Sequence, residues 1–383
     1  MVDIYSGREQ TQAKHFILKR YLQELAFKVL TFQDITFVDG FSGPWETKTE
    51  DFRDSSFMIA ISVLKDAQQR IFDTRGVRRK IGCFFSESNP QTHALLQEAV
   101  APFDKPGDLF EIRTHSGEFE DAVSDIQNFI GGSFPLIFID PTGWTGYPFD
   151  KIAPLFDRPK CEVLINFMFD YIRRFASSDD PATIASLNPI LGGPGWRDRL
   201  DKTLQRGLGV EKLFRDTLRD VGKFRYVIST KIDKATVDRP HFFLAYGTKS
   251  DDGIKAFREV EYGALREHAR NRATAQERQR ERKSGTADLF PGHRAEIQEE
   301  TIDEIVETQK HAATTKLLSV LSAKGRLPFS EVVTLLLEPY ILRETNVKDI
   351  CVALANAGKI ENTWGGGRRK PHAKSPIILK LDV

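Results

Sequence analysis

Three apolar segments of the chain end at acidic residues, and small residues are frequent in the turns that follow. The acids, each at the end of a run of apolar or small residues, are Asp39, Glu87 and Asp140. A carboxylate in such a place can accept hydrogen bonds from a ligand or orient a reacting group. The turn after the first acid contains two glycines, which let backbone N–H groups approach a ligand without a Cβ in the way. Its residues are Gly40, Phe41, Ser42 and Gly43.

Strand and helix patterns alternate around these acids. Asn89 and Pro90 begin a predicted helix that runs to about residue 100, because proline is tolerated at a first helical turn. Further strands are predicted at residues 109–114 and 161–169. Two alternating runs, residues 224–232 and 241–248, pair as an antiparallel hairpin. Parallel strands need helical crossovers, so this order predicts an α/β, doubly wound, mostly parallel sheet with a C-terminal antiparallel hairpin. The acids then lie at the carboxyl ends of strands, where open α/β sheets bind ligands.

An amphipathic helix, residues 12–29, is predicted before the first strand. Lys14, His15 and Lys19 lie in it and have two interpretations. In the favoured one, the helix simply packs on the sheet. In the other, these three residues border the ligand site.

The composition is that of an ordinary soluble globular protein, with 40% hydrophobic and 28% charged residues. A chain of 383 residues is long enough for two domains, each with a core of its own. The formal net charge of +1 does not indicate a partner, so a nucleic-acid-binding surface must come from local charge. We find neither a signal peptide nor an apolar run of roughly 20 residues, the length that a membrane span requires.

The three cysteines, Cys83, Cys161 and Cys351, are far apart and odd in number. They fall in predicted strands and a predicted helix, which favours buried free thiols in a reducing cytoplasm. No spacing of cysteine and histidine suggests zinc, and no metal site is expected.

The composition changes after residue 248. Residues 264–283 contain seven Arg and Lys against three Glu, which fits a solvated charged connector or an arm that contacts phosphates. We therefore expect a first domain at residues 1–255, a charged linker or helix at 256–300, and a second domain at 301–383.

Three helical patterns and two short strands around a glycine-rich basic tip end the chain, an order typical of a small winged-helix domain. Basic side chains in its third helix and in its wing would neutralise phosphates and give salt-dependent binding. They are Lys348, Arg368, Arg369, Lys370 and Lys374. Winged helices also dock proteins, so nucleic-acid binding is one of two interpretations.

The strand order and the turn after Asp39 resemble class I S-adenosylmethionine-dependent methyltransferases. The turn is similar to their first motif, in the Asp-x-Phe-Ala-Gly form of enzymes that methylate bases, although Trp45 follows Pro44 where a third glycine is usual. The resemblance implies S-adenosylmethionine as cofactor, with the Glu87 carboxylate on both ribose hydroxyls. The residues that it places around the cofactor are Asp39, Gly40, Phe41, Ser42, Gly43, Glu87, Ser116 and Gly117.

Asp140 and Pro141 resemble the start of the Asp-Pro-Pro-Tyr motif of amino-group methyltransferases, in which a carboxylate and a carbonyl hold an exocyclic amine. Trp144 or Tyr147 could supply the stacking ring, or Trp144 packs on the domain as a loop aromatic. Asn166 either lines the substrate side or is a buried hydrogen-bonded amide. The catalytic residues that we predict are Asp140, Pro141, Trp144 and Asn166. The alternative for Asp140 is a helix cap or an ion-pair partner.

A wider resemblance extends over roughly the first 250 residues. It is based on residues 14–22, 37–44, 138–143 and 164–175, and it is to the three-Cys-motif partner family. This is a bacterial group named for its occurrence beside a protein with a three-cysteine motif, which the resemblance implies as a partner. Its C-terminal region is described as winged-helix-like.

Two hypotheses of different class follow. In the first, the chain is a methyltransferase that acts on a base amino group in nucleic acid. In the second, it is a catalytically inactive module of the same fold that binds nucleic acid or a partner protein through its winged helix. A nuclease is a weaker third, since no metal-binding carboxylate cluster stands out.

Overall fold

The structure is a computed structural model that describes residues 4–43, 47–49, 51–175, 178–286, 292–365 and 369–380. Pro44, Trp45 and Arg368 lie outside the described residues. The chain divides into two compact units, Met1–Ser250 and Asp251–Val383. The three strand-end acids belong to the first unit.

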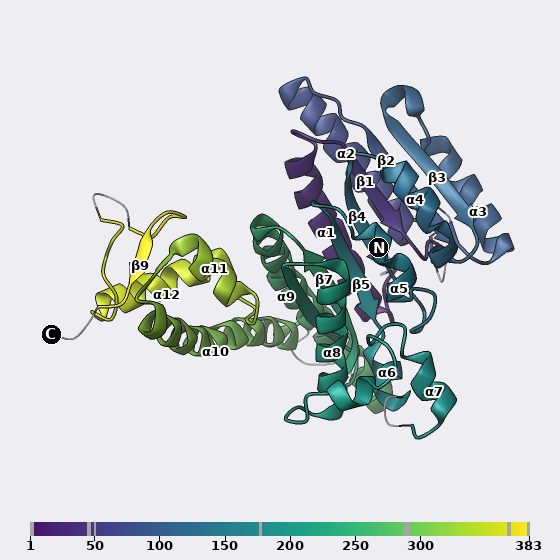
Figure 1. Cartoon of the computed structure of the whole chain (residues 1–383). Coiled ribbons are helices and arrows are strands. Elements are labelled where there is room, and N and C mark those ends of the chain that lie inside the picture. The colour runs from purple at the N-terminus through teal and green to yellow at the C-terminus, as the bar shows by residue number, and fades with distance from the viewer. Residues whose placement is uncertain are drawn as a thin grey trace. The chain divides into compact units, whose positions relative to one another are not determined.

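A seven-stranded sheet with the order β3-β2-β1-β4-β5-β7-β6 forms the middle of the first unit (Figure 1). The strands are β1 (Ile35–Asp39), β2 (Ile81–Glu87), β3 (Phe110–Ser116), β4 (Phe134–Ile139), β5 (Glu162–Phe167), β6 (Tyr226–Asp233) and β7 (Pro240–Thr248). β1 to β5 are parallel, and β7 is antiparallel to both β5 and β6. The predicted doubly wound, mostly parallel sheet of methyltransferase-like order, with its antiparallel hairpin, is therefore confirmed.

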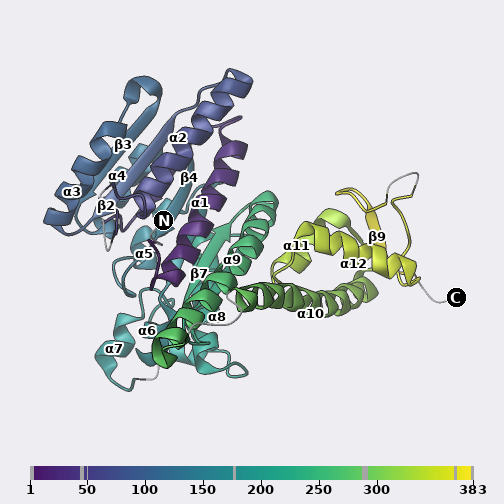
Figure 2. The same cartoon turned by 180° about the vertical axis from the view of Figure 1, so that it is seen from behind.

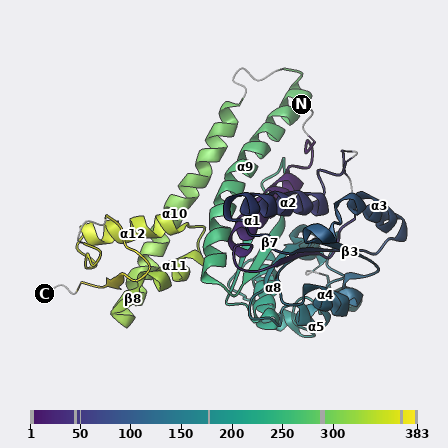
Figure 3. The same cartoon turned by 90° about the horizontal axis from the view of Figure 1, so that it is seen from above.

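Helices cover both faces of this sheet. One layer consists of α1 (Glu9–Val29), α2 (Ser56–Arg75) and α3 (Pro90–Val100), and the other of α4 (Val123–Ile130), α5 (Phe149–Ile152) and α8 (Arg206–Gly222) (Figure 3). Figure 2 shows α1 and α2 in front of the strands. Because both faces are covered, every residue of β1, β2, β4 and β5 is buried, which explains their continuous apolar runs.

Local sequence signals set the ends of the helices beside the site. The Ser55 side chain caps α2 by accepting from the Met58 N–H at 3.3 Å. Asn89 caps α3 in the same way, and Pro90 occupies the first helical position, where no N–H is needed. After β5, which ends at Phe167, the chain enters two short helices, α6 (Phe169–Phe175) and α7 (Pro181–Ser186). The strand predicted for residues 161–169 is thus two residues too long at its end.

The second unit begins with two long helices, α9 and α10, which lie side by side (Figure 3). Its elements are α9 (Asp251–Ser284), α10 (His293–Lys324), β8 (Arg326–Pro328), α11 (Phe329–Leu337), α12 (Glu344–Asn356) and β9 (Pro376–Ile378). Residues 256–300, expected as a linker or helix, lie mainly in α9 and the first turns of α10. β9 pairs antiparallel with β8, a strand that we did not predict, whereas Ile360 meets Leu379 at a single bridge.

Within the described part of the chain, no helix combines the length and apolar character needed to cross a membrane. Cys83, Cys161 and Cys351 are buried and form no disulfide, so the prediction of free buried thiols is confirmed.

Candidate functional site

A cleft of about 750 Å³ opens at the carboxyl rim, the edge of the sheet where β1 to β5 end. Seven of the sequence-predicted site residues line it: Gly40, Phe41, Glu87, Gly117, Asp140, Pro141 and Trp144. Asp39, Ser42, Gly43, Ser116 and Asn166 are not among its lining residues. Residues from the ends of four strands therefore meet at one cleft, as the sequence predicts.

The turn after β1 is fixed by hydrogen bonds to the neighbouring strands. The Gly40 N–H donates to the Phe138 carbonyl at 3.0 Å, and the Ser42 N–H donates to the Ser86 carbonyl at 2.8 Å. Gly40 is required here for space, because a Cβ on it would lie 2.9 Å from the ring of Phe119. Ser42 is fully buried, and its hydroxyl donates to the Asp39 carbonyl at 2.9 Å. The turn is thus a rigid wall of the cleft.

Asp39 supports this turn from below. Its side chain is fully buried and accepts hydrogen bonds from the Ser56 hydroxyl at 2.6 Å and from the Phe41 N–H at 3.1 Å. Burial raises the pKa of Asp39 to about 7, although these two hydrogen bonds act to lower it. Asp39 therefore positions the turn from within the protein instead of facing the cleft.

Glu87 faces the cleft from the end of β2. It is only 3% exposed, and its Oε1 atom accepts a hydrogen bond from the Asn89 N–H at 2.7 Å. The Glu87 carbonyl accepts from the Gly117 N–H at 3.0 Å, which joins the ends of β2 and β3. Gly117 has φ +151°, and a Cβ on it would lie 2.7 Å from Nε2 of His115. Ser116 is exposed beside it. The Glu87 carboxylate is therefore held in one orientation at the cleft wall.

Asp140 forms the centre of a polar triad. Its Oδ2 atom lies 2.5 Å from Nζ of Lys14 in α1, and its Oδ1 atom accepts a hydrogen bond from Asn166 Nδ2 at 2.7 Å. Asn166 is 3% exposed, and its Oδ1 atom has no hydrogen-bond partner among the described residues. α1 packs on the sheet as expected, and Lys14 in addition contacts Asp140, which lines the cleft.

His15 and Lys19 do not share this position. They line a separate pocket of about 400 Å³ together with Tyr5. Burial lowers the pKa of His15 to about 3, and its Nδ1 atom lies 3.1 Å from the Tyr5 hydroxyl. His15 is therefore a buried neutral side chain.

Of the two predicted stacking rings, both among the described residues, Trp144 lines the cleft and Tyr147 does not. The Trp144 Nε1–H donates to Ser186 Oγ at 3.1 Å, and its ring lies 4.7 Å from the ring of Phe175. Tyr147 is fully buried, which makes it unsuitable for stacking a substrate base and corrects that alternative. Trp144 is both packed on the domain and accessible from the cleft.

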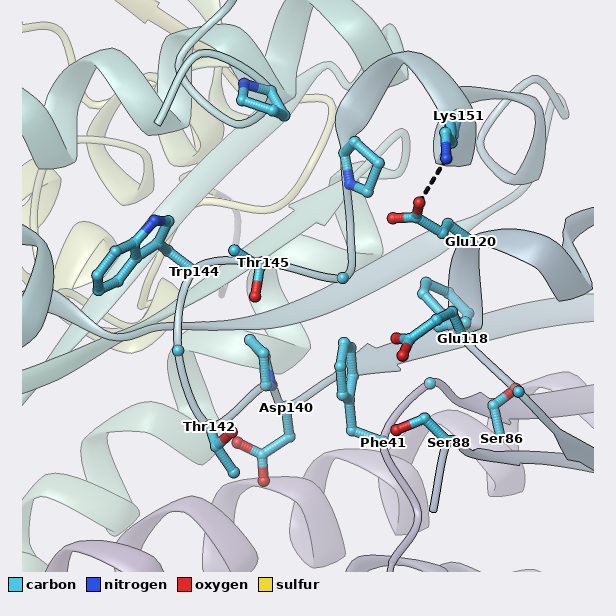
Figure 4. A pocket seen from close by; sticks show the side chains of 18 of the residues that line it. Phe41, Ser86, Ser88, Glu118, Glu120, Asp140, Thr142, Trp144, Thr145 and Lys151 are labelled. Carbon is cyan, nitrogen blue, oxygen red and sulfur yellow. Dashed lines mark hydrogen bonds and ion pairs between the residues drawn. The ribbon is translucent and has the colours of Figure 1, made fainter. Parts of the chain in front are cut away.

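The cleft is acidic, a property that we did not predict. Among the described residues that line it, five are acidic: Glu87, Glu118, Glu120, Asp140 and Asp150. Lys151 is the one cation of this lining, and its Nζ atom lies 2.5 Å from Oε1 of Glu120. Figure 4 shows Glu118 and Glu120 on the side of Lys151, whereas the Asp140 carboxylate points away from them. Glu118 follows Gly117 directly and Glu120 lies two residues further on, so their place just after a strand end is the signal that could have found them.

The basic residues predicted to bind nucleic acid lie in the second unit. Lys348 of α12 pairs with Glu344 at 2.7 Å, and Lys370 pairs with Asp349 at 2.7 Å. Arg369 and Lys374 are exposed, and Arg368 lies outside the described residues. Two of the four described cations are thus compensated by acids of α12.

No group of three or more His, Cys, Asp or Glu among the described residues is arranged to hold a metal ion.

No protein-family model and no curated protein matches the sequence. Two solved structures with weak similarity are methyltransferases. The O-methyltransferase from Bacillus cereus in complex with SAH is 14% identical, with a TM-score of 0.31 over 60% of this chain and 80% of that chain. Loganic acid methyltransferase with SAH is 8% identical, with a TM-score of 0.28 over 79% of this chain and 92% of that chain. Both scores are low, so we assign the fold from the strand order of the sheet.

Proposed function

We propose that this protein is an S-adenosylmethionine-dependent methyltransferase that binds its cofactor in the cleft at the carboxyl rim and acts on a base amino group in nucleic acid. The observation that supports this most strongly is the meeting of Gly40, Glu87, Gly117 and Asp140 at one cleft. These residues come from the ends of four different strands, and all four are among the site residues predicted from the sequence.

The charge and size of the cleft fit the cofactor. S-adenosylmethionine has one carboxylate, one ammonium and one sulfonium, so its net charge is positive and an acidic lining attracts it. The volume of about 750 Å³ is ample for a ligand of its size. Ser86 is fully buried beside the cleft, and its Oγ atom has no hydrogen-bond partner among the described residues. A bound polar group would satisfy this atom.

The protein's contribution to the reaction is alignment. When bound, the cofactor supplies a methyl group activated by the positive sulfur. Glu87 holds the ribose, because an oriented carboxylate can accept hydrogen bonds from two hydroxyls. Asp140 accepts a hydrogen bond from the acceptor amine, takes up the proton that the nitrogen loses, and keeps its own position through Lys14 and Asn166. Pro141 offers its carbonyl to the same amine, and Trp144 offers a ring face to the base.

Mass spectrometry tests this proposal. DNA and RNA are incubated with the protein and with S-adenosylmethionine that has an isotope-labelled methyl group, then digested to nucleosides. We expect the label on an exocyclic amine of one base. Label on neither nucleic acid, under conditions in which the protein binds the cofactor, would refute the nucleic-acid acceptor.

The alternative, a module of the same fold without catalysis, is favoured by one observation. The Lys14–Asp140 ion pair leaves the two side chains only 12% and 16% exposed, so Asp140 is already compensated without a substrate. If this alternative is correct, the protein binds nucleic acid but no labelled methyl group leaves the cofactor in its presence.

The second unit supports a smaller part of the proposal. Its order of helix, strand, two helices and a final strand suits a winged-helix domain, with Lys348, Arg369, Lys370 and Lys374 near nucleic acid. We propose a protein with a three-cysteine motif as partner, on the sequence resemblance alone. Co-purification of the two proteins from a common host, against a chain truncated after residue 250, tests that partnership.

A further inference from the structure

A cluster of four cations surrounds one buried carboxylate in the first unit. We call it the Asp170 cluster. The Asp170 side chain is 2% exposed and lies in α6, directly after β5. Its Oδ2 atom lies 2.6 Å from Lys234 Nζ and 2.8 Å from Arg174 Nη2, and its Oδ1 atom lies 3.4 Å from Arg239 Nε and 3.7 Å from Arg173 Nη2. Lys234 and Arg239 come from the turn between β6 and β7.

The charges of this cluster do not balance. One carboxylate faces four cations, and the turn that supplies Lys234 and Arg239 contains one acid, Asp238, so the cations still outnumber the acids. Lys231 and Asp233 pair with each other at 3.2 Å, so they leave the sum unchanged. A purely structural ion pair would need one or two of these cations. Instead, the side chains of Arg173, Arg174 and Arg239 remain 43%, 56% and 42% exposed, and the excess positive charge faces solvent.

The cluster lies next to the acceptor end of the cleft. Phe175, at the end of α6, has its ring 4.7 Å from Trp144, which lines the cleft. α6 has seven residues and is therefore about 10 Å long. On the other side, Lys14 binds Asp140 and also lies 5.9 Å from the ring centre of Phe242 in β7. Lys14 therefore lies beside β7, the strand that begins directly after Arg239 of the cluster.

Exposed aromatic rings accompany the arginines. Tyr171 is 42% exposed and Phe175 37% exposed, and the Arg174 guanidinium lies 5.8 Å from the centre of the Tyr171 ring. Proteins bind single-stranded nucleic acid by combining a cationic groove for the backbone with aromatic rings for the bases. Small anions need the cations alone, so the aromatic rings favour a strand.

We infer that the Asp170 cluster binds the phosphate backbone of a nucleic-acid strand and brings a base of that strand to Asp140. The phosphate contact stands on the geometry of the cluster, and the delivery of a base to Asp140 rests on the proposed function. Asp170 holds the four cations in place, so that they meet the phosphates without further ordering.

The test uses the full chain with Arg174→Ala and Arg239→Ala combined. Lys234 is left in place, so Asp170 keeps its closest partner and the fold is retained. Binding of a fluorescent single-stranded DNA of roughly 30 nucleotides is measured by anisotropy from about 50 to about 200 mM salt. We expect affinity to fall at least about tenfold and the salt slope to drop by about 1.4, since each phosphate contact accounts for about 0.7.

The matched control is Arg70→Ala combined with Arg75→Ala. It removes the same charge from two exposed side chains of α2, and it should change affinity less than about twofold. An RNA strand of the same sequence and adenosine monophosphate are measured beside the DNA. If the mononucleotide bound as tightly as the strands, the cluster would be a small-phosphate site and the inference would be wrong.

Binding of S-adenosylhomocysteine by each variant separates the two proposals. Lost strand binding with unchanged binding of this product supports the inference. An unchanged salt slope, or a wild-type protein without strand binding, overturns it. The wild-type protein could also bind no S-adenosylhomocysteine while the double variant loses strand binding. That result would refute the methyltransferase proposal and still support the phosphate contact. If thermal denaturation shows that the double variant is unfolded, Arg173→Ala alone, whose pairing distance is the longest, must still reduce the slope by about 0.7.

Discussion

The acidic cleft and the Asp170 cluster lie along the same rim of one sheet and have opposite charge. The cleft presents Glu87, Glu118 and Glu120 at the ends of β2 and β3, whereas the cluster gathers Arg and Lys side chains around a single acid after β5. A sulfonium cofactor suits the first region, and a phosphate backbone suits the second. The two ligands of the proposed reaction are thus sorted by charge before any specific contact forms.

Asp140 lies where these regions meet. It lines the cleft and is paired with Lys14, whose ammonium lies on the side of β7 and the cluster. Asp140 can therefore contact both the cofactor and the nucleic acid. Lys14 and Asn166 hold its side chain in place between the acidic cleft and the Asp170 cluster.

The largest effect is expected from Asp140→Ala. We expect the rate of methyl transfer to fall about a thousandfold or more, because the acceptor loses its orienting group. Binding of cofactor and of nucleic acid should change by less than about threefold, since neither region is removed. Asp150→Ala, which also removes an acid from the cleft lining, is the control. Equal losses in both variants, measured by single-turnover label transfer, would show that only the total charge of the cleft matters.

The two buried acids should make stability depend on pH with opposite sign. Burial raises the pKa of Asp39 to about 7, so its contribution is fully present below about pH 4 and is lost as pH rises to about 7. Burial acts to raise the pKa of Asp170 as well, but the cations around it, Lys234 first, hold that pKa below its usual value. The contribution of Asp170 to the free energy of unfolding is therefore present at neutral pH and is lost on acidification.

Denaturant unfolding at several pH values measures this difference. In the wild type, the free energy of unfolding should fall by about 4 kcal/mol between about pH 4 and pH 7 through Asp39, and Asp39→Asn should remove this fall. Asp170→Asn should instead reduce the loss of stability in acid. The same pH profile for both variants would contradict the assigned environments of these acids.

A smaller effect is expected on stability, where the loss of Asp170 should cost more free energy of unfolding than the loss of an acid from an ion pair of the second unit. Asp170→Ala should lower the free energy of unfolding by about 2 kcal/mol, because several charged hydrogen bonds to a buried acid are lost. Asp349→Ala breaks an exposed pair with Lys370 and should cost less than about 0.5 kcal/mol. Chemical denaturation monitored separately for each unit gives both values, and comparable costs would remove the distinction.

The smallest effect is expected in the wing. Replacing Lys370 alone by alanine should lower the salt slope for duplex DNA by less than about 0.9, the share of one phosphate contact, because Lys370 is already paired with Asp349. The Arg174→Ala and Arg239→Ala variant serves as the reference. A larger loss from the wing than from the Asp170 cluster would make the second unit the main nucleic-acid contact.

The sequence predicts the sheet and one wall of the site because both depend on local patterns. Apolar runs, a hairpin and acids at strand ends are enough to bring Asp39, Glu87 and Asp140 to one rim. They do not show which way a carboxylate points. Asp39 is turned inward by Ser56 and Phe41, a contact between the end of β1 and the start of α2.

The remaining parts depend on contacts between distant segments. Lys14 and Asp140 are 126 residues apart, and Asp170 and Arg239 are 69 residues apart, so no local spacing signals either pair. The basic run at residues 368–370 is conspicuous in the sequence, yet in the structure Lys370 is neutralised by an acid of α12. The sequence alone therefore does not show which basic residues are already paired with acids.

The most direct test of the proposed function is isothermal titration calorimetry of S-adenosylhomocysteine with the wild-type chain and with Glu87→Ala, with Glu111→Ala on β3 as control. We predict micromolar binding that Glu87→Ala weakens at least about tenfold, since hydrogen bonds to a charged group contribute about 1.5–3 kcal/mol. The control should bind as the wild type does. No heat of binding to the wild-type chain, or equal affinity of all three proteins, would contradict a cofactor in this cleft.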